Sequence, residues 1–295
     1  MIELRTVDGD ADLAAWAELK STVVPNEPVT AEQVRASEEP GRLLLLAELD
    51  GVLAGCGIGA PSHFEGFAFL AARVLPAYRR TGVGTALVRA LADHARRLGG
   101  RDGVNAFVYA DEPHSIAFVE HFGLAEIDYQ LEQVRLVGDE PPPVVPDGIE
   151  LVVLDGRREE LLNAVWPVAL QGYADLPVPG EVTYVLEEWL RDEATRPEGS
   201  FAAFAGGVPV GYAGLIKHAN GSATAEHGLT VVHREHRGRG IGRALKQAQL
   251  RWASRNGVIE LVTWTQKGNE SMQSLNRSLG YADKSKVITY RGPLP

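Results

Sequence analysis

The stretch that decides the fold is Arg237-Gly238-Arg239-Gly240-Ile241-Gly242-Arg243, which follows the apolar run Leu229-Thr230-Val231-Val232. The apolar run predicts a strand, and the amphipathic segment after the glycines predicts a helix. The first turn of a helix carries unpaired N–H groups and the positive end of the helix dipole. Glycines let the backbone approach a phosphate closely, and the arginines add positive charge. The sequence therefore predicts a pyrophosphate site at this helix start.

The same pattern occurs a second time, nearer the N-terminus. The stretch Arg79-Arg80-Thr81-Gly82-Val83-Gly84-Thr85 lies 158 residues earlier, as Gly82 against Gly240 shows. Farther along, Gly123 and Gly280 keep an offset of 157 residues. Because this period is far longer than that of a solenoid, we interpret the chain as a duplicated domain.

A proline-rich stretch marks the boundary between the two copies. Pro141-Pro142-Pro143 can neither continue a helix nor lie inside a sheet, so it predicts a semi-rigid spacer. Directly after it, Ile149-Glu150-Leu151 repeats the opening Ile2-Glu3-Leu4. We therefore predict an N-terminal domain at 1–138, a linker at 139–148 and a C-terminal domain at 149–295.

Composition excludes several classes of protein. The 295 residues carry a net charge of −10, which argues against a nucleic-acid partner. Residues 1–138 hold 12 Lys and Arg against 20 Asp and Glu, whereas residues 139–295 hold 17 against 19, so the second half suits an anionic ligand better. Cys56 is the single cysteine, which excludes an intrachain disulfide and a four-cysteine zinc site, and we expect no metal. With no secretory signal and no membrane-spanning run, we expect a cytoplasmic protein without a membrane partner.

Periodicity and turn residues predict the same order of elements in both halves, β-α-α-β-β-β-α-β-α-β. In the first half the expected strands are 2–7, 42–49, 52–60, 67–75, 105–110 and 126–137, and the expected helices are 11–24, 30–39, 82–98 and 113–121. In the second half the strands are 149–154, 200–206, 208–218, 223–233, 259–265 and 286–291, and the helices are 158–171, 183–196, 241–256 and 270–279. The fold class is α/β (α+β), with two tandem domains, each a mixed, mostly antiparallel, twisted sheet flanked by helices.

These residues resemble the GNAT superfamily of N-acetyltransferases. The pyrophosphate loop of that family, R/Q-x-x-G-x-G/A, is matched once by Arg237, Gly240 and Gly242 and once by Arg79, Gly82 and Gly84. The phrase V-x-P-x-x-R before the loop is matched by Val74 to Arg79, and Val232 to Arg237 matches it without the proline. The resemblance covers nearly the whole chain, in two copies.

The resemblance implies acetyl-CoA as the donor and a fold of two tandem GNAT domains. Its pyrophosphate would lie on residues 237–243, and its pantetheine arm would pair with the backbone of Val231 or Val232, between the strands 223–233 and 259–265. A later family helix carries an Asn near its start, which Asn269 and Asn276 match before Gly280-Tyr281. In the first copy the corresponding cofactor-binding residues are Val74, Arg79, Arg80, Thr81, Gly82, Val83, Gly84 and Thr85.

The resemblance also implies direct transfer of the acetyl group to a primary amine of a small molecule or peptide. An alkylammonium has a pKa of about 10.4 and no lone pair, so a general base is needed. Glu226 and His227 precede the loop, and as neighbours on a strand they face opposite sides of the sheet. Many family members place a thiolate-protonating Tyr where this chain has Val119 and Asn276. Where the family has the Asn near the helix start, the first copy has Asp111 or Glu112, which is a poor neighbour for an anionic cofactor. We therefore place catalysis in the second half, with Glu226, His227 and Asn276 as its candidate residues.

Two rival functions stay open at this point. The missing Tyr also fits a catalytically silent CoA-binding sensor or a structural pseudoenzyme. A helix start of this kind could also bind another nucleotide, as in an ATP-dependent ligase. The acceptor would meet the loop 171–180, where Tyr173 and Asp175 could face a cationic amine, and the chain would be a monomer or a homodimer.

Overall fold

The computed structural model describes residues 1–62, 66–98, 102–177, 185–218 and 221–295. Contacts divide the chain into two compact units, one formed by Met1–Ile127 with Ile288–Pro295 and the other by Asp128–Val287. We describe each unit separately.

Unit 1 is a mixed sheet with helices on both faces. Its strands run in the order β1-β2-β3-β4-β5, followed by the end of β12 (Ala282–Gly292), with β4 and β5 parallel and the strands from β1 to β4 in antiparallel pairs. The elements are β1 (Ile2–Thr6), α1 (Gly9–Val23), α2 (Ala31–Ala36), β2 (Leu43–Leu49), β3 (Val52–Pro61), β4 (Phe67–Val74), the 3-10 turn η1 (Pro76–Tyr78), α3 (Val83–Arg97), β5 (Gly103–Tyr109), α4 (Pro113–His121) and the start of β6 (Ala125–Leu136).

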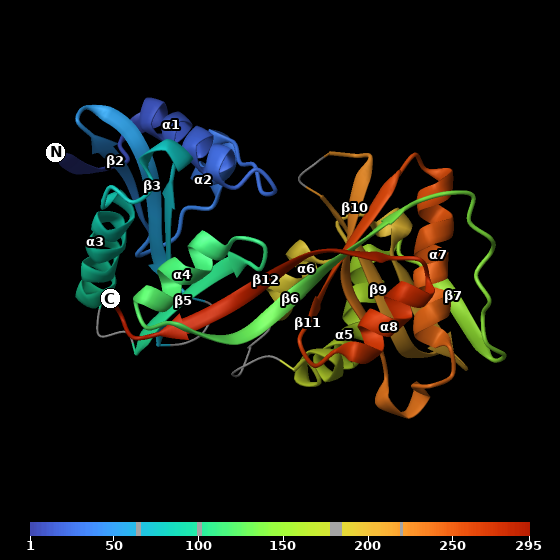
Figure 1. Ribbon diagram of the computed structural model, residues 1–295. Coiled ribbons are helices and arrows are strands. Elements are labelled where there is room, and N and C mark those ends of the chain that lie inside the picture. The colour runs from blue at the N-terminus through green and yellow to red at the C-terminus, as the bar shows by residue number, and fades with distance from the viewer. Residues whose placement is uncertain (63–65, 99–101, 178–184, 219–220) are drawn as a thin grey trace. The chain divides into compact units, whose positions relative to one another are not determined.

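The alternation of side chains along β3 explains the two layers of helices in unit 1. Cys56 and Ile58 pack with α1 and α2 on one face. Gly57 and Gly59 face the other way, where a Cβ atom would touch Leu91 of α3. Figure 1 shows α1 and α3 on opposite sides of these strands.

Unit 2 repeats this plan. Its strands run in the order β12-β6-β11-β10-β9-β8-β7, with β10 and β11 parallel. The elements are β7 (Ile149–Val153), α5 (Arg158–Ala174), α6 (Leu186–Asp192), η2 (Pro197–Gly199), β8 (Phe201–Ala205), β9 (Val208–Lys217), β10 (Thr224–Val232), η3 (Arg234–His236), α7 (Ile241–Arg255), β11 (Glu260–Gln266), α8 (Glu270–Ser278) and β12 (Ala282–Gly292).

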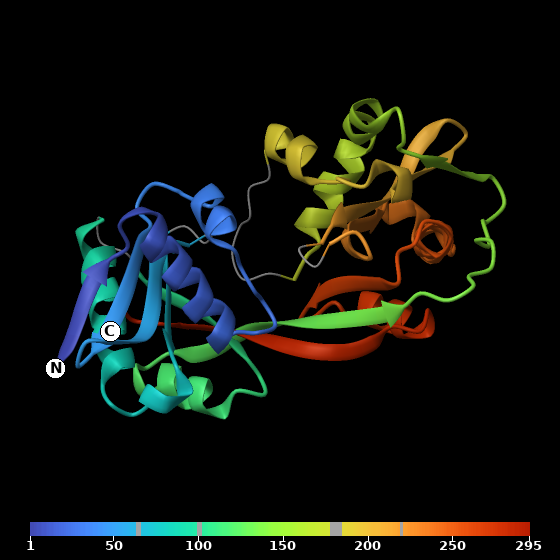
Figure 2. The same cartoon turned by 90° about the horizontal axis from the view of Figure 1, so that it is seen from above.

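Hydrophobic clusters cover both faces of the sheet in unit 2. Tyr212 and Val231 pack with α5 and α6, around Trp189. Ala213 and Val210 pack instead with Ile241 and Leu245 of α7. Figure 2 shows α5 and α6 on one side of these strands and α7 on the other. The predicted order of elements and the α/β fold class are confirmed in both halves.

The units do not coincide with the halves expected from the sequence. Residues 130–136 of β6, expected in the first domain, pair antiparallel with β11 in unit 2. The last residues of β12, expected in the second domain, belong to unit 1, where Arg291 donates from Nε to Asn105 Oδ1 at 2.8 Å. The expected spacer also belongs to unit 2, because Arg251 of α7 bonds the Glu140 carbonyl and Val144 N donates to Gln247. Sequence periodicity identifies a strand but not its partner, which explains the difference.

Candidate functional site

The loop before α7 has the geometry expected of an anion site. Gly238 and Gly240 adopt φ of +74° and +84°, a left-handed conformation that favours glycine. Gly240 is the N-cap residue of α7, and the residues from Arg237 to Gly240 are exposed. Ile241 is buried and anchors the helix start in the core. The free amides of the first turn of α7 therefore border solvent beside an exposed loop.

Two arginines near this loop bind Asp175, and two others have different partners. Arg237 donates to Asp175 Oδ2 at 2.5 Å and to the Val232 carbonyl at 3.0 Å, and Arg234 binds the same carboxylate. Hydrogen bonds from Arg234 and then Arg237 lower the Asp175 pKa to about 2. Asp175, suggested as a contact for a cationic amine, instead fixes two arginines at the end of α5. Arg239 lies beside His236, and Arg243 donates to Ser278 of α8.

The loop of unit 1 has the same backbone shape. Gly82 caps α3 with φ +94°, and Arg80 adopts φ +66° where the second copy has Gly238. Thr81 closes the turn by donating to the Tyr78 carbonyl, and Val83 is buried as Ile241 is. Gly84 allows close packing of Phe118, 3.2 Å from an added Cβ, and Thr85 continues the helix. The two predicted loops are thus both present, with Val74 and Arg79 flanking η1.

In unit 2, β10 and β11 stop pairing and separate before β10 reaches the loop that precedes α7. Their parallel register extends over only three pairs and ends at Glu226 and Val262, whereas β11 pairs with β6 over seven residues. On its other side, β10 shifts register against β9 between His227 and Thr230, which is a β-bulge. The splaying predicted for the strands 223–233 and 259–265 is therefore present.

The register of β10 distinguishes the two valines predicted to contact the pantetheine. His233 N bonds Val210 O on β9, so by alternation the Val231 amide also faces β9. The Val232 and Thr230 amides then face the β11 side, where the strands have parted. Val232, rather than Val231, is positioned to bind a ligand through its amide.

Two buried oxygen atoms on this side have no hydrogen-bond partner among the described residues. They are Thr230 Oγ1 on β10 and Asn276 Oδ1 on α8. Leu275, next to Asn276, lies with Val232 around Gly242, so α8, β10 and the start of α7 converge there. Asn276 is fully buried and donates from Nδ2 to Gln133 Oε1 at 2.9 Å, while Asn269 is the N-cap residue of α8. Unpaired oxygens beside parted strands fit a polar ligand such as the pantetheine arm.

Glu226 and His227 face opposite sides of the sheet, as expected, and Glu226 shares its face with Ile216, which lines a cavity. His227 is buried under α7, with Nδ1 2.9 Å from Gln249 Oε1 and Nε2 2.5 Å from Tyr281 Oη. Burial and then Lys246 lower its pKa well below the ordinary value. The expectation that His227 serves as a base is therefore not supported, because the core encloses the imidazole.

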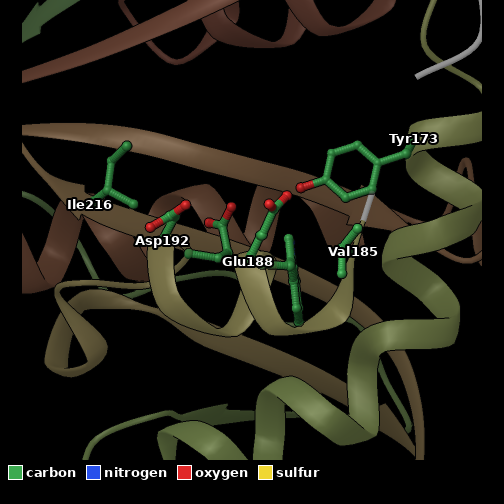
Figure 3. Close-up of a pocket in the computed structure, with 7 residues that line it drawn as sticks. Tyr173, Val185, Glu188, Asp192 and Ile216 are labelled. Atoms are coloured by element: carbon green, nitrogen blue, oxygen red, sulfur yellow. The ribbon is translucent and has the colours of Figure 1, made fainter. Parts of the chain in front are cut away.

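Glu226 pairs in register with Ile216, so both side chains lie on the α5 and α6 face. There a cavity of about 300 Å³ is lined by Tyr173, Val185, Glu188, Trp189, Asp192, Glu193 and Ile216. In Figure 3, Glu188 and Asp192 come from α6, and Tyr173 approaches from α5. Burial, followed by the charges of Glu132 and Glu193, raises the Glu226 pKa. Residues 178–180 of the expected acceptor loop lie outside the described residues.

Sequence reasoning missed Glu193, the most deeply buried carboxylate of this cavity. Glu193 follows α6 directly and is 9% exposed. Tyr212 donates to its Oε1 at 3.1 Å, and the bulge amide of Leu229 lies 3.3 Å from the same oxygen. In the sequence, Asp192-Glu193 ends an acidic helix that is typical of a solvent-exposed face, so no local signal separates Glu193 from its neighbours.

Comparison with known proteins assigns this chain to a protein family. The family model described as "Acetyltransferase (GNAT) family" matches residues 12–124 and again residues 160–281. The chain belongs to the GNAT acetyltransferase family. Several relatives carry the name mycothiol acetyltransferase, and two of them match nearly the whole chain. The protein from Nocardia farcinica is 30% identical over 299 residues, covering 97% of this chain and 93% of the relative. The protein from Thermobispora bispora is 27% identical over 303 residues, covering 98% of each. The chain is therefore an acetyltransferase.

Solved structures share the tandem GNAT fold. A GCN5-related N-acetyltransferase from Sphaerobacter thermophilus has a TM-score of 0.80 at 22% identity, covering 99% of this chain and 96% of that one. A tandem GNAT protein from the clavulanic acid biosynthesis pathway has a TM-score of 0.74 at 22% identity, covering 100% and 99%.

The described part of this chain shows neither a membrane-spanning helix nor a cluster of metal ligands. None of its helices has the length and apolar character needed to cross a bilayer. Within the same residues, no three His, Cys, Asp or Glu side chains converge as metal ligands would.

Proposed function

We propose that the C-terminal half of the chain transfers an acetyl group from acetyl-CoA to the primary amine of a small molecule by direct attack. The observation that carries this proposal is the parting of β10 from β11 beside the glycine loop of α7, with Glu226 at the last shared pair. A donor could enter between the strands, and an acceptor could approach from the cavity on the α5 and α6 face.

The residues suited to hold the donor come from three elements. The amides after Gly238 and Gly240 and the charges of Arg239 and Arg243 suit the pyrophosphate. The Val232 amide and the unpaired oxygens of Thr230 and Asn276 suit the pantetheine arm. Acetyl-CoA supplies the activated acyl group as a thioester. An amide beside the thioester carbonyl would stabilise the negative charge that develops on its oxygen.

We further propose that unit 1 does not catalyse the reaction. By the 158-residue offset, Ala68 occupies the position of Glu226, so that unit lacks a carboxylate there. Its β4 also pairs with β3 in unbroken register from Ala68 to Val74, without the bulge of β10. Release of free thiol from acetyl-CoA with a panel of amines tests the proposed reaction directly.

The test of the site replaces Gly240 by Ala and measures CoA binding by calorimetry. A Cβ at this position meets only Pro146, at 3.7 Å, so the expected damage comes from the left-handed backbone and the phosphate approach. We expect CoA affinity of unit 2 to fall at least tenfold. Gly257→Ala is the matched control, because Gly257 has φ +74° just beyond the other end of α7 and its Cβ would be unhindered.

Both substitutions should cost about 1 kcal/mol of stability, because both force Ala into the left-handed region. Only Gly240→Ala should weaken CoA binding. Equal CoA affinity in the two variants would remove the loop of α7 from the donor site.

A further inference from the structure

The charged side chains that line the cavity on the α5 and α6 face are all acidic among the described residues. Of the seven described residues that line it, three are carboxylates, Glu188, Asp192 and Glu193, and none is Lys, Arg or His. Trp189 supplies a wall that is 5% exposed, and its indole N–H has no hydrogen-bond partner among the described residues. The lining thus combines negative charge with an unused donor.

The carboxylate of Glu193 is built into the sheet. Gly214 of β9 and Gly228 in the bulge of β10 leave the space that it occupies, because a Cβ on either would lie 1.9 or 2.0 Å from Oε1. Tyr212 and the Leu229 amide donate to it from the same two strands. Leu229 is followed by Thr230, whose amide faces the parted strands. The carboxylate therefore lies beside the backbone that would border the reacting thioester.

We propose that this cavity takes the acceptor as a cation without a carboxylate, and that Glu193 holds its ammonium and removes the proton. This inference rests on the proposed function and adds to it the residue and the class of acceptor. A carboxylate on the acceptor would meet three like charges, which is unfavourable in a partly buried site. A neutral oxygen on the acceptor could instead accept the hydrogen bond that the Trp189 N–H offers.

The polar and charged groups around Glu193, on β9, β10, α5 and α6, are consistent with its acting as a general base. From β9 and β10 it meets Tyr212 and Glu226, and α6 adds Glu188 and Asp192. From α5, Arg158 directs its guanidinium at the carbonyls of Leu190, Glu193 and Ala194 rather than at the carboxylate. Burial raises the Glu193 pKa, and its hydrogen bonds and the nearby charge of Arg158 oppose this shift. A carboxylate with a raised pKa is a better proton acceptor.

The proposed step balances in atoms and charge. Glu193 accepts one proton from the ammonium, and the freed amine nitrogen attacks the thioester carbonyl carbon. The C–N bond forms and the C–S bond breaks, with the electron pair leaving on sulfur. The second amine proton neutralises this thiolate, giving the acetamide and free thiol, and Glu193 returns its proton to solvent.

The test measures thiol release from acetyl-CoA by the full chain between pH 5.5 and 9. The acceptors are a matched pair, L-leucinamide and L-leucine, which share an ammonium and differ in an amide against a carboxylate. At pH 6, where both acceptors are mainly ammonium ions, we expect KM to be at least tenfold lower for leucinamide. With leucinamide we then follow kcat/KM. It should rise with pH through the raised pKa of Glu193, since only the ionised carboxylate can accept the proton.

Three substitutions assign the proton acceptor. Glu193→Gln should lower kcat at least 100-fold, remove the acidic limb of the pH profile and leave CoA affinity unchanged. Glu226→Gln should keep the limb but move it to lower pH, because one neighbouring negative charge is gone. Glu188→Gln, on the exposed part of α6, should raise KM less than tenfold and leave the limb in place.

A limb that persists in Glu193→Gln, or that disappears in Glu226→Gln instead, would overturn the assignment of Glu193. Faster reaction of leucine than of leucinamide would overturn the acceptor class. If the wild-type protein binds CoA but releases no thiol with either amine, the proposed function fails together with this inference. Activity that survives in Glu193→Gln overturns this inference alone.

Discussion

Lys246 of α7 is a buried charge with a measurable consequence for stability. Its side chain is 1% exposed, with Nζ 5.5 Å from the centre of the Tyr281 ring, and burial lowers its pKa to about 7. An unfolded lysine titrates near pH 10.4, so between about pH 7 and 10 the unfolded state binds more protons than the folded state. The free energy of unfolding should therefore rise with pH over this window as far as Lys246 is concerned.

We expect Lys246→Met to stabilise the protein by about 3 kcal/mol at pH 6.5, with the gain shrinking toward pH 10. Urea unfolding at pH 6.5, 8 and 9.5 measures this trend. Lys217→Met, at the exposed end of β9, is the control and should show no such pH dependence. If Lys246→Met stabilised the protein equally at all three pH values, the pKa of Lys246 would not be lowered in the folded state.

At the residue scale, sequence reasoning succeeded where one local rule was sufficient. Strand alternation alone required Glu226 and His227 to face opposite sides, and the structure places Glu226 on the α5 and α6 face and His227 under α7. The motif likewise located both loops, where Gly82 and Gly240 cap the two helices. Glu193 could not be found in this way. Its importance arises from Gly214, Gly228 and Tyr212, which approach it only after folding.

At the element scale, the bulge of β10 and the end of α6 are coupled through one carboxylate. Gly228→Ala would bring a Cβ to 2.0 Å from Glu193 Oε1, so the carboxylate must move. We expect a loss of about 2 kcal/mol in the free energy of unfolding. In a Glu193→Ala background the same substitution should cost less than ~0.5 kcal/mol, because the clash is gone. A double-mutant cycle by chemical unfolding measures the difference.

The control cycle combines Gly228→Ala with Glu188→Ala. Glu188 lines the same cavity but does not occupy the space beside Gly228, so these two effects should add within about 0.5 kcal/mol. Additivity in the Glu193 cycle as well would show that the bulge tolerates a side chain without displacing Glu193.

The elements themselves were largely predictable, because hydrophobic period and turn residues are local signals. Gly206-Gly207 marks the turn between β8 and β9, and Gly240 marks the start of α7, as expected. The assignment of strands to units was not predictable. The pairing of β6 with β11 joins residues more than 120 positions apart, such as Glu132 and Trp264, and no local pattern encodes it.

At the scale of the whole molecule, this pairing decides which fragment can fold. Residues 130–136 cover β11 over seven pairs, and Gln133 bonds Asn276 of α8 and Asp283 of β12. A fragment that begins at the apparent domain boundary, residue 149, loses all of these contacts and leaves β11 with an unpaired edge. Exposed edges of this kind promote aggregation.

We therefore expect residues 128–287 to form a soluble fragment with a cooperative thermal transition, and residues 149–287 to aggregate or unfold without one. Size-exclusion chromatography and thermal unfolding followed by circular dichroism compare the two. A control fragment of 128–287 with Gln133→Leu loses the bonds to Asn276 and Asp283 but keeps the strand, so it should fold with reduced stability. If 149–287 unfolded as cooperatively as 128–287, β6 would be dispensable to unit 2, and the proline-rich stretch would be a true domain boundary.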